Sequence, residues 1–301
     1  MLLSVVVTIV ESGEALGECL RALDSQEGAP TLEILVPYDD SVLDLAELQR
    51  AHPSALFLAM GRVATEHPLH SPAGQHELFD RRRAAGLARA KGELIAIVED
   101  RGVPRPDWAA KFVKLHEQPY AVVGGAVECG IDHPLNWAVY FCDFSRYQLP
   151  FKGGPADYVT DVNICYKRSA LEATKALWQQ RYHETQVNWT LREQGQTLFL
   201  APEVVVDQVR RNRNLLTMVS ERYHWGRLFA YTRVTHAGPL ERLKYLFAAP
   251  LLPAVLFARH GRTQLTKKEH LVRFVMVAPL VGALLVPWSV GEMVGYATGK
   301  A

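Results

Sequence analysis

Two adjacent carboxylates, Glu99 and Asp100, follow directly after the apolar run Leu94–Val98. The run has the length and composition of a buried strand, and a proline-containing turn and a helical pattern follow it. In open α/β sheets, ligands bind outside the carboxyl ends of the strands. Two carboxylates at such an end can hold a ribose, or a hard divalent cation that carries phosphates. We therefore expect a binding site around Glu99 and Asp100.

The elements that must position these residues alternate between strand and helix over the first 125 residues. Strands are predicted at Leu3–Val10, Leu32–Val36, Leu56–Met60 and Leu94–Val98. Helices are predicted at Glu14–Gln26, Leu43–His52, Arg81–Lys91 and Asp107–Leu115, with a surface loop over Gly61–Asp80. This order indicates a parallel sheet with helices on both faces. Farther along, the pattern predicts strands at Ala121–Val127, Thr160–Lys167 and Leu198–Val206, and helices at Ser169–Trp178 and Glu184–Gln194.

The composition fits one large folded domain with an appendage. The 301 residues carry a formal net charge of +1 and are 49% hydrophobic, so neither overall charge nor a readout motif favours nucleic-acid binding. The four cysteines are scattered without a CxxC pair, and we expect reduced thiols in a cytosolic environment. The apolar segment Met1–Val10 lacks a basic region and a small-residue cleavage site, which favours a first strand over a signal peptide.

The last third of the chain changes from basic and aromatic to apolar. Arginines, Arg213 among them, alternate with aromatic residues over 210–233. The apolar stretch Tyr245–Ala258 is 14 residues long, which is too short for a span of about 20 residues. Phe274–Tyr296 is long enough at 23 residues, but it is interrupted by Pro279, Pro287 and Glu292.

Basic residues lie in the predicted loop between the two apolar stretches, and the positive-inside rule keeps that loop on the cytoplasmic side. They are Arg259, Arg262, Lys267, Lys268 and Arg273. We expect one interfacial or re-entrant segment, followed by one that spans the membrane or dips into it, on the cytoplasmic face of the inner (cell) membrane. The alternative is a soluble helical hairpin with a buried apolar face. The predicted division is a catalytic domain over 1–209, basic amphipathic linker helices over 210–244 and a membrane-docking or transmembrane region over 245–301.

Several short segments, in one order along the chain, resemble landmarks of the family 2 glycosyltransferases with a GT-A fold. They are Ser4–Glu11 with the helix at Leu16–Gln26, Glu33–Ser41, Arg83–Glu93, Glu99–Arg101 in the place of an Asp-x-Asp motif, Pro106–Trp108, Asp161–Arg168, and His183–Thr185 with Leu191 and Gly195. The resemblance covers roughly residues 3–230. It implies an α/β GT-A fold, which is a Rossmann-like mixed sheet of a nucleotide-diphospho-sugar transferase, with C-terminal membrane-associated helices.

The resemblance also implies roles for single residues. Asp39 would contact the nucleotide base, while Glu99 and Asp100 would take the ribose and the diphosphate–metal region. The other reading of these three acids is a structural or solvated one. The further donor-binding candidates are Thr8, Glu11, Arg83 and Arg101, and the acceptor-side candidates are Trp108 and Asn163. The basic stretch 210–233 would approach a donor or lipid phosphate, or lie on anionic lipid.

Arg101 is the main departure from the family pattern, which usually has an aspartate there to bind a divalent ion. Three readings are open. Asp100 alone anchors a weakly held Mg²⁺ or Mn²⁺, most of whose ligands come from the donor phosphates. Alternatively, Arg101 replaces part of the metal's charge by pairing with phosphate oxygens. In the third reading Arg101 points to solvent.

For the catalytic base the resemblance implies the segment around Glu184, where Thr185 replaces the usual aspartate. Glu184 opens a helix, and a helix N-terminus favours the ionised carboxylate. His183 is the second candidate because imidazole titrates near neutrality. The competing reading of Glu184 is a helix-capping acid. A single base without a covalent nucleophile implies inversion at the anomeric carbon.

The function expected from these observations is an inverting, membrane-associated glycosyltransferase. It would move a sugar from a nucleotide donor to a lipid or glycan hydroxyl. The altered motif positions keep open a second class, a catalytically inactive GT-A module that binds nucleotide-sugar or a partner transferase. A nucleotidyltransferase is disfavoured because Thr8–Gly13 lacks its glycine-rich basic loop.

Overall fold

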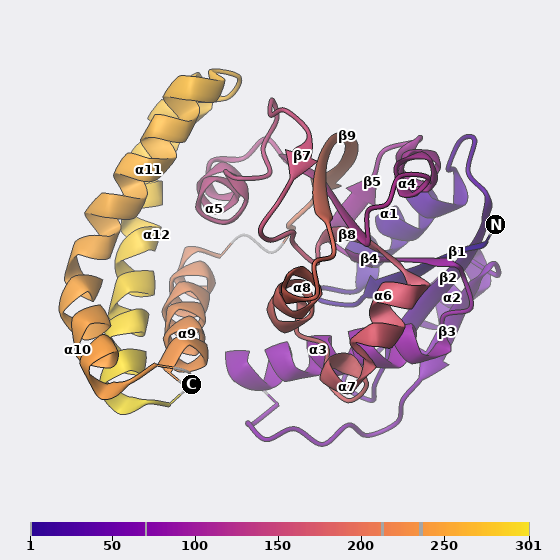
Figure 1. The fold of residues 1–301 in the computed structure, drawn as a ribbon, viewed down its shortest axis with the longest axis horizontal. Coiled ribbons are helices and arrows are strands. Elements are labelled where there is room, and N and C mark those ends of the chain that lie inside the picture. Colours follow the sequence, from indigo (N-terminus) through magenta and orange to yellow (C-terminus); the bar gives the residue numbers. More distant parts are fainter. Residues whose placement is uncertain (1, 70, 212–213, 235–236, 301) are drawn as a thin grey trace. The chain divides into compact units, whose positions relative to one another are not determined.

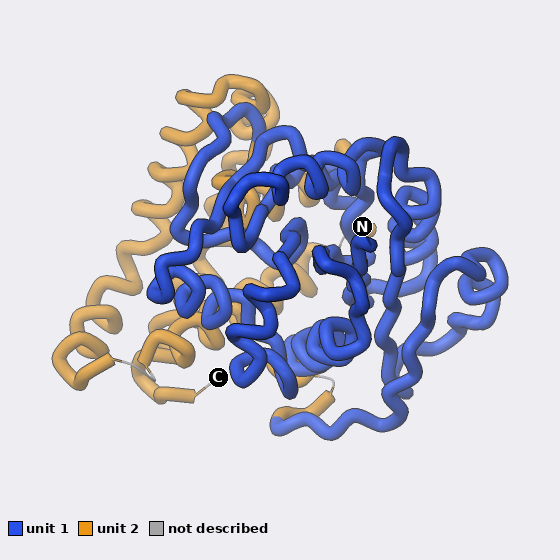
Figure 2. Tube along the Cα trace, turned by 45° about the vertical axis from the view of Figure 1, so that its right-hand side comes forward, with its two compact units in different colours: residues 1–66, 76–130, 149–210 blue, residues 67–75, 131–148, 211–301 orange. Residues whose placement is uncertain are grey.

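The structure is a computed structural model (Figure 1) that describes residues 2–69, 71–211, 214–234 and 237–300. Arg213 of the basic stretch lies outside these residues. The chain forms two compact units (Figure 2). Unit 1 comprises residues 1–66, 76–130 and 149–210, and unit 2 comprises residues 67–75, 131–148 and 211–301. The segment 131–148, inside the predicted catalytic domain, clusters with the C-terminal helices.

Nine strands in the described part of the chain form one mixed sheet in unit 1. They are β1 (Leu2–Thr8), β2 (Thr31–Tyr38), β3 (Ala55–Ala59), β4 (Leu94–Glu99), β5 (Gly102–Pro104), β6 (Val122–Cys129), β7 (Gly154–Pro155), β8 (Asn163–Lys167) and β9 (Leu198–Gln208). The order is β3-β2-β1-β4-β8-β6-β9-β5, with β7 beside β9. Strands β3, β2, β1 and β4 run parallel, and β8 joins β4 in antiparallel register. The predicted mixed α/β fold is therefore confirmed.

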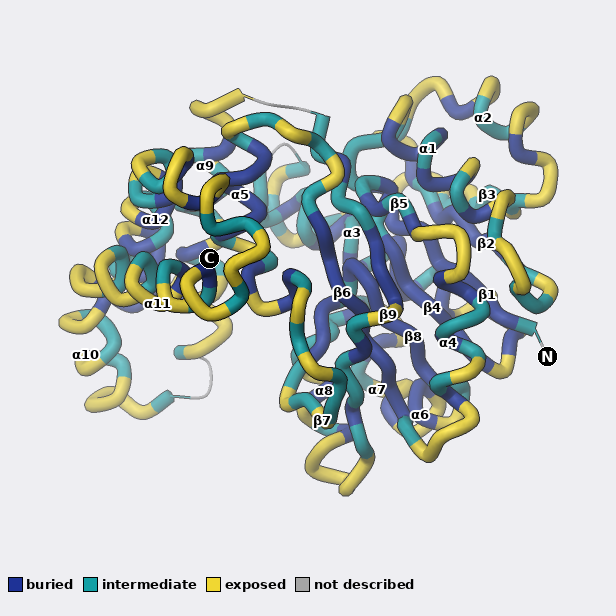
Figure 3. The backbone as a smooth tube through the Cα atoms, turned by 90° about the horizontal axis from the view of Figure 1, so that it is seen from above, coloured by how far each residue is buried: buried dark blue, intermediate teal, exposed yellow. Residues whose placement is uncertain are grey.

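Helices cover both faces of this sheet because its strands alternate their side chains between two apolar cores. Leu3, Val5 and Val7 of β1 belong to one core, and Val6 belongs to the other. The first core includes residues of α1 (Gly13–Asp24) and α4 (Trp108–His116), and the second includes residues of α3 (Pro72–Arg89), α6 (Arg168–Ala173), α7 (Lys175–Trp178) and α8 (Glu184–Glu193). A short α2 (Ala46–Ala51) connects β2 to β3. The buried strands are seen in Figure 3.

Helix α3 is longer than predicted, because it begins at Pro72 within the segment expected to be a loop. Its approach to the sheet requires a glycine. A Cβ built on Gly86 would lie 2.4 Å from Cγ1 of Val6 and 3.0 Å from Cγ of Pro37. Residues three and four positions before Gly86 share its helix face. The close approach therefore brings Arg82 and Arg83 against the sheet.

Unit 2 is helical in its described part. Its helices are α5 (Pro134–Phe144), α9 (Leu215–Val234), α10 (Pro239–Ala248), the 3₁₀ turn η1 (Ala249–Leu251), α11 (Leu252–Lys267) and α12 (Leu271–Thr298). The predicted basic loop is wrong in large part, since Arg259, Arg262 and Lys267 lie within α11. Helix α12 runs through both of its prolines, and it is the one described helix that is long and apolar enough to cross a membrane.

Helices α9 and α12 of unit 2 pack backbone to backbone. A Cβ on Gly291 of α12 would lie 2.0 Å from the carbonyl oxygen of Tyr223 in α9. Such a contact excludes any larger residue unless the helices separate. The two helices therefore form one rigid pair. The four cysteines of the chain are free thiols, as predicted.

Candidate active site

The acidic residues of unit 1 meet at the edge where β1, β2 and β4 end. Asp39 follows β2, Glu99 ends β4, and Asp100 follows it. Strand β8 runs antiparallel to β4, with Asn163 opposite Val98. Asp161, two residues before Asn163, therefore lies at the same edge. Sheet topology alone thus gathers carboxylates from distant parts of the chain.

Arg83 pairs with three carboxylates of this cluster. Its guanidinium lies 3.0 Å from Glu99, 2.9 Å from Asp161 and 3.4 Å from Asp80. Burial lowers the pKa of Arg83, but the three carboxylates outweigh that effect and the net pKa is raised. Arg83 was predicted to bind the donor. In the structure its guanidinium pairs with three carboxylates, and its role towards the donor stays a prediction.

Glu184 stands at the first position of α8. The hydroxyl of Tyr158 donates a hydrogen bond of 2.5 Å to its Oε1. Burial, helped by the charge of Asp161, raises the pKa of Glu184 to about 8, although Tyr158 and Arg83 oppose the shift. A carboxyl with a pKa near the working pH is suited to accept a proton in a reaction.

Asp80 organises the other side of the cluster. Its carboxylate lies 3.1 Å from Nε of Arg181 and 3.4 Å from Nδ1 of His183. Burial raises the pKa of Asp80 to about 7. The pKa of His183 is lowered to about 4 by burial and by the charges of Arg181 and Arg83. His183 is therefore a neutral and weakly basic imidazole, and Glu184 is the better candidate base.

Asp39 is held by a second arginine of α3. Nε and the terminal nitrogen Nη2 of Arg82 lie 2.7 and 2.6 Å from Oδ2 of Asp39, and the amide of Ser41 donates to Oδ1. Arg82 also donates to the carbonyl oxygen of Ile9. Burial raises the pKa of Asp39, but the hydrogen bonds from Ser41 and the charge of Arg82 reverse this and lower it. Asp39 thus lies at the predicted edge, with its carboxylate already bound inside the protein.

Asp100 binds the loop that follows β1. Its carboxylate accepts hydrogen bonds from the amides of Val10 (3.0 Å), Glu11 (3.0 Å) and Ser12 (2.6 Å), and its side chain is fully buried. Successive amides that converge on one anion form an anion-binding nest. Asp100 is therefore the anion of this nest. Beside it, Nε of Arg101 donates to Glu11 over 3.2 Å, and both side chains are 17% exposed.

Three predicted site residues lie in the core of unit 1, which corrects their assignment. Thr8, Trp108 and Asn163 are fully buried. Trp108 donates to the side-chain oxygen of Asn163 (2.9 Å), and Asn163 donates to the carbonyls of Ala126 and Val204. Trp108 and Asn163 therefore join α4, β6, β8 and β9, and they present no surface to an acceptor. The Oγ1 of Thr8 is buried without a hydrogen-bond partner among the described residues.

Several residues of the cluster were missed from the sequence. Asp161 was visible inside the motif Asp161–Arg168, yet it was not assigned a role. Asp80 was placed at the end of a predicted loop. Arg82 lies in a run of three arginines, a pattern that is typical of a solvent-exposed helix face. Its burial depends on Asp39, which lies 43 positions away in the sequence. Tyr158 and Arg181 carry no local signal.

Two arginines of the stretch 210–233, Arg222 and Arg233, hold α9 within unit 2. Arg222 pairs with Asp143 of unit 2 at 2.7 Å. Arg233 lies over the rings of Phe229 (4.6 Å) and Tyr245 (4.9 Å). These contacts give the arginines a packing role inside unit 2.

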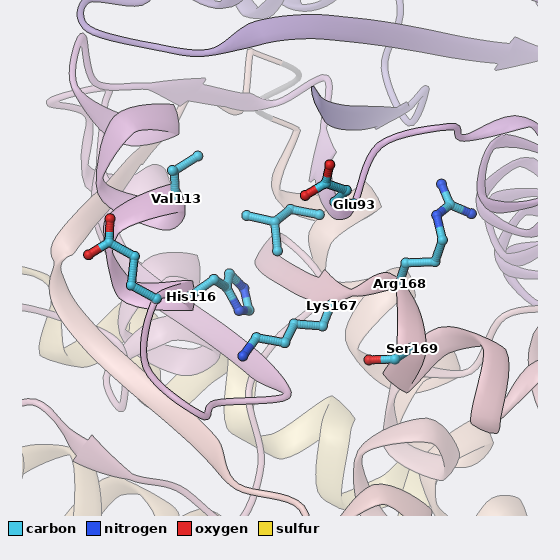
Figure 4. Close-up of a pocket in the computed structure, with 8 residues that line it drawn as sticks. Glu93, Val113, His116, Lys167, Arg168 and Ser169 are labelled. Carbon is cyan, nitrogen blue, oxygen red and sulfur yellow. The ribbon is translucent and has the colours of Figure 1, made fainter. Parts of the chain in front are cut away.

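One pocket of unit 1 has a volume of about 290 Å³ and is shown with its lining residues in Figure 4. It is lined by residues that include Leu94, the first residue of β4, whereas Glu99 is the last. The polar groups at its wall serve the fold: Arg168 donates to the carbonyls of Ala90 and Gly92, and Lys167 to that of Gln118. We assign no chemistry to this pocket.

Comparisons with known proteins agree with the fold and identify the family. The family model described as "Glycosyl transferase family 2" matches residues 4–174. The structure is similar to that of the mannosyltransferase PcManGT from Pyrobaculum calidifontis in complex with GDP-Man and Mn²⁺. The TM-score is 0.52 at 16% sequence identity, and the match covers 97% of this chain and 86% of that chain. At this identity the likeness speaks for the fold alone. No curated protein sequence matches the chain.

Proposed function

The chain belongs to the family 2 glycosyltransferases, and from that premise we propose that it moves a hexose from a nucleoside-diphosphate donor to a hydroxyl acceptor. The observation that carries the proposal is the convergence of Glu99, Asp161 and Glu184 around Arg83 at one edge of the sheet. The GDP-Man bound by the mannosyltransferase of similar fold supports a donor of this class.

In the proposed reaction Glu184 takes the proton of the acceptor hydroxyl. Its ionised form accepts the proton as the acceptor oxygen attacks the anomeric carbon and the bond to the diphosphate breaks. Tyr158 stabilises that ionised form by donating to Oε1. The charges of Asp161 and Asp80 raise the pKa of Glu184, and the charge of Arg83 lowers it. Because no carboxylate is assigned as a nucleophile, the anomeric carbon inverts in one displacement.

A divalent cation is implied by the family and by the Mn²⁺ of the similar structure. Among the described residues, no three His, Cys, Asp or Glu side chains are grouped so that they could hold a metal ion. The carboxylate oxygens of Asp100, the expected anchor, accept amide hydrogen bonds. These residues do not fit the ion, and we route no step through it.

We also propose that unit 2 attaches the protein to a membrane surface and that the acceptor is a lipid or a glycan presented there. Support comes from exposed apolar side chains on its helices, which include Leu240, Phe247, Leu251, Val272 and Met276. Such a surface, bordered by basic residues, favours the interface with anionic lipid. We propose the cytoplasmic face of the inner membrane, because the basic residues Arg259, Arg262, Lys267, Lys268 and Arg273 of α11, α12 and their junction would be attracted to its anionic leaflet.

The packing of α12 on α9 supports attachment without a span. A spanning α12 would carry α9 with it, since the two helices touch at Gly291 and Tyr223. Helix α9 contains Glu221, Arg222 and Arg227, and each charge at the centre of a bilayer costs about 2.5–3.5 kcal/mol or more. We therefore infer that α12 lies in the interface.

The test of the proposed activity is release of nucleoside diphosphate from a panel of UDP-, GDP- and dTDP-hexoses, with the full chain bound to anionic vesicles. At least one donor should be hydrolysed slowly, and faster when a lipid or glycan acceptor is added. Binding of a donor without turnover under any condition would favour the inactive module. The occupation of Asp39 and Asp100 by internal partners is the observation that keeps this alternative in view.

A further inference from the structure

The three residues in the place of the Asp-x-Asp motif all have partners inside the protein. Glu99 pairs with Arg83 at 3.0 Å, and Asp100 accepts hydrogen bonds from three successive amides. Arg101, the third residue, pairs with Glu11 at 3.2 Å. The third position of the motif thus carries a positively charged side chain, whereas an acidic side chain there would bind a metal cation.

A metal ion would have to compete with strong internal contacts. Mg²⁺ and Mn²⁺ bind through oxygen atoms that are open to the ion. Both oxygens of Asp100 already accept hydrogen bonds, and its side chain is fully buried. If Asp100 turned towards a metal, the amides of Val10, Glu11 and Ser12 would lose their acceptor. The hydrogen bonds that Asp100 accepts therefore disfavour a metal ion at this edge of the sheet.

Arg101 has the chemistry to take the place of the ion. Its hydrogen bond to Glu11 uses Nε, and a guanidinium carries two further nitrogens that match a phosphate in bidentate fashion. The pair is 17% exposed, unlike the buried Asp100. A diphosphate at this edge would exchange with the Glu11 carboxylate, which is itself an anion bound to Arg101.

We propose that this protein binds the diphosphate of its donor without a divalent cation, and that Arg101 supplies the positive charge after the diphosphate displaces Glu11. This inference rests on the proposed function, because it concerns the same donor. Glu11 is then a placeholder that keeps the Arg101 guanidinium in position before the donor arrives.

The experiment is calorimetric titration of the full chain with UDP and GDP, in excess EDTA and in Mn²⁺. For the wild type we expect the tighter nucleotide to bind with the same affinity in both, within about twofold. The variant Arg101→Ala should bind about tenfold or more weakly in EDTA, as expected when a charge-assisted contact is lost. The control is Arg105→Ala, which removes a nearby exposed arginine paired with Asp207 and should leave affinity unchanged.

A second variant separates displacement from a purely structural pair. Glu11→Gln removes the competing charge, so UDP or GDP should bind several-fold more tightly than to the wild type, whereas a structural role of the pair predicts weaker binding. Binding of UDP or GDP in Mn²⁺ but not in EDTA would overturn the inference and leave the proposed function standing. Absence of nucleotide binding in both conditions would overturn both. Equal binding by wild type and Arg101→Ala in EDTA would overturn the role of Arg101.

Discussion

The two units differ most in where their large apolar side chains lie, since both bury charged groups: Arg82, Arg83 and Asp100 in unit 1, and Arg222 and Glu292 in unit 2. In unit 1 the exposed large apolar residues among those described are three: Leu43, Leu56 and Trp189. Every other exposed large apolar residue of the described chain lies between Leu215 and Val290, in unit 2. Figure 3 shows that the strands of unit 1 are largely buried and that long parts of α10 and α11 are exposed. Unit 1 gathers charged groups at one edge of its sheet, and unit 2 exposes the apolar side chains on which the proposed membrane attachment depends.

The largest effect is expected in unit 1, from replacing Glu184, the candidate base that this unit positions. Glu184→Gln should lower turnover by roughly 10²–10⁴-fold, since proton transfer by a positioned group contributes about that much. Binding of nucleoside diphosphate, measured by titration, should stay within about twofold. The control is Glu193→Gln at the exposed end of the same helix. Wild-type turnover by Glu184→Gln would remove Glu184 from the mechanism.

The next effect concerns the buried amide that joins α4 to three strands of unit 1. Asn163→Leu leaves the indole N–H of Trp108 without its acceptor and also deletes two donors. We expect a loss of roughly 2–4 kcal/mol in the free energy of unfolding, by urea denaturation. The matched change Gln196→Leu alters an exposed amide of unit 1 and should cost little. Equal losses from the two changes would mean that the buried network adds nothing.

In unit 2, a charge placed on an exposed apolar position should leave stability unchanged but weaken binding to lipid vesicles. Phe247 is 73% exposed on α10, so Phe247→Glu should leave the Tm unchanged. It should weaken sedimentation with anionic vesicles by about tenfold, because a buried Phe contributes about 1.5–3 kcal/mol. Leu43, equally exposed in unit 1, supplies the control Leu43→Glu. If both changes weaken vesicle binding alike, the contrast between the units fails.

The smallest effect is on pH dependence. Since the base must be ionised and the pKa of Glu184 is raised to about 8, kcat/KM should rise with pH across that value. Tyr158 donates to the ionised carboxylate and so lowers its pKa. Tyr158→Phe should therefore move the rising limb to higher pH, by up to about one unit for the loss of one hydrogen bond. A limb that moves to lower pH would contradict this account.

The sheet of unit 1 was predictable from sequence because its strands are apolar runs that end in turn residues. Every strand predicted before residue 100 is present, with ends shifted by one or two residues. The first half of α3 was missed because residues 72–80 show no apolar period: Glu77 and Asp80 are polar residues that the structure buries. Helix α5 was missed as well, and it is apolar around most of its circumference.

The sequence predicted where in the sheet the candidate site lies, but not which partners its carboxylates have. Strand ends located Asp39, Glu99 and Asp100, because the carboxyl ends of neighbouring parallel strands share one edge. Which carboxylate is open and which is bound depends on Arg82 and Arg83, whose directions follow from the close approach of α3 at Gly86. Sequence patterns carry no information on that approach.

The amide nest around Asp100 changes how a common mutagenesis result must be interpreted. Replacing Asp100 by alanine would strip the acceptor from three partly buried amides, and a donor left without a partner costs up to about 1–3 kcal/mol. The loop ahead of α1 would lose its shape, and an inactive Asp100→Ala would report a collapsed loop instead of a missing metal ligand. Asp100→Asn, which keeps one acceptor oxygen, is the more informative substitution.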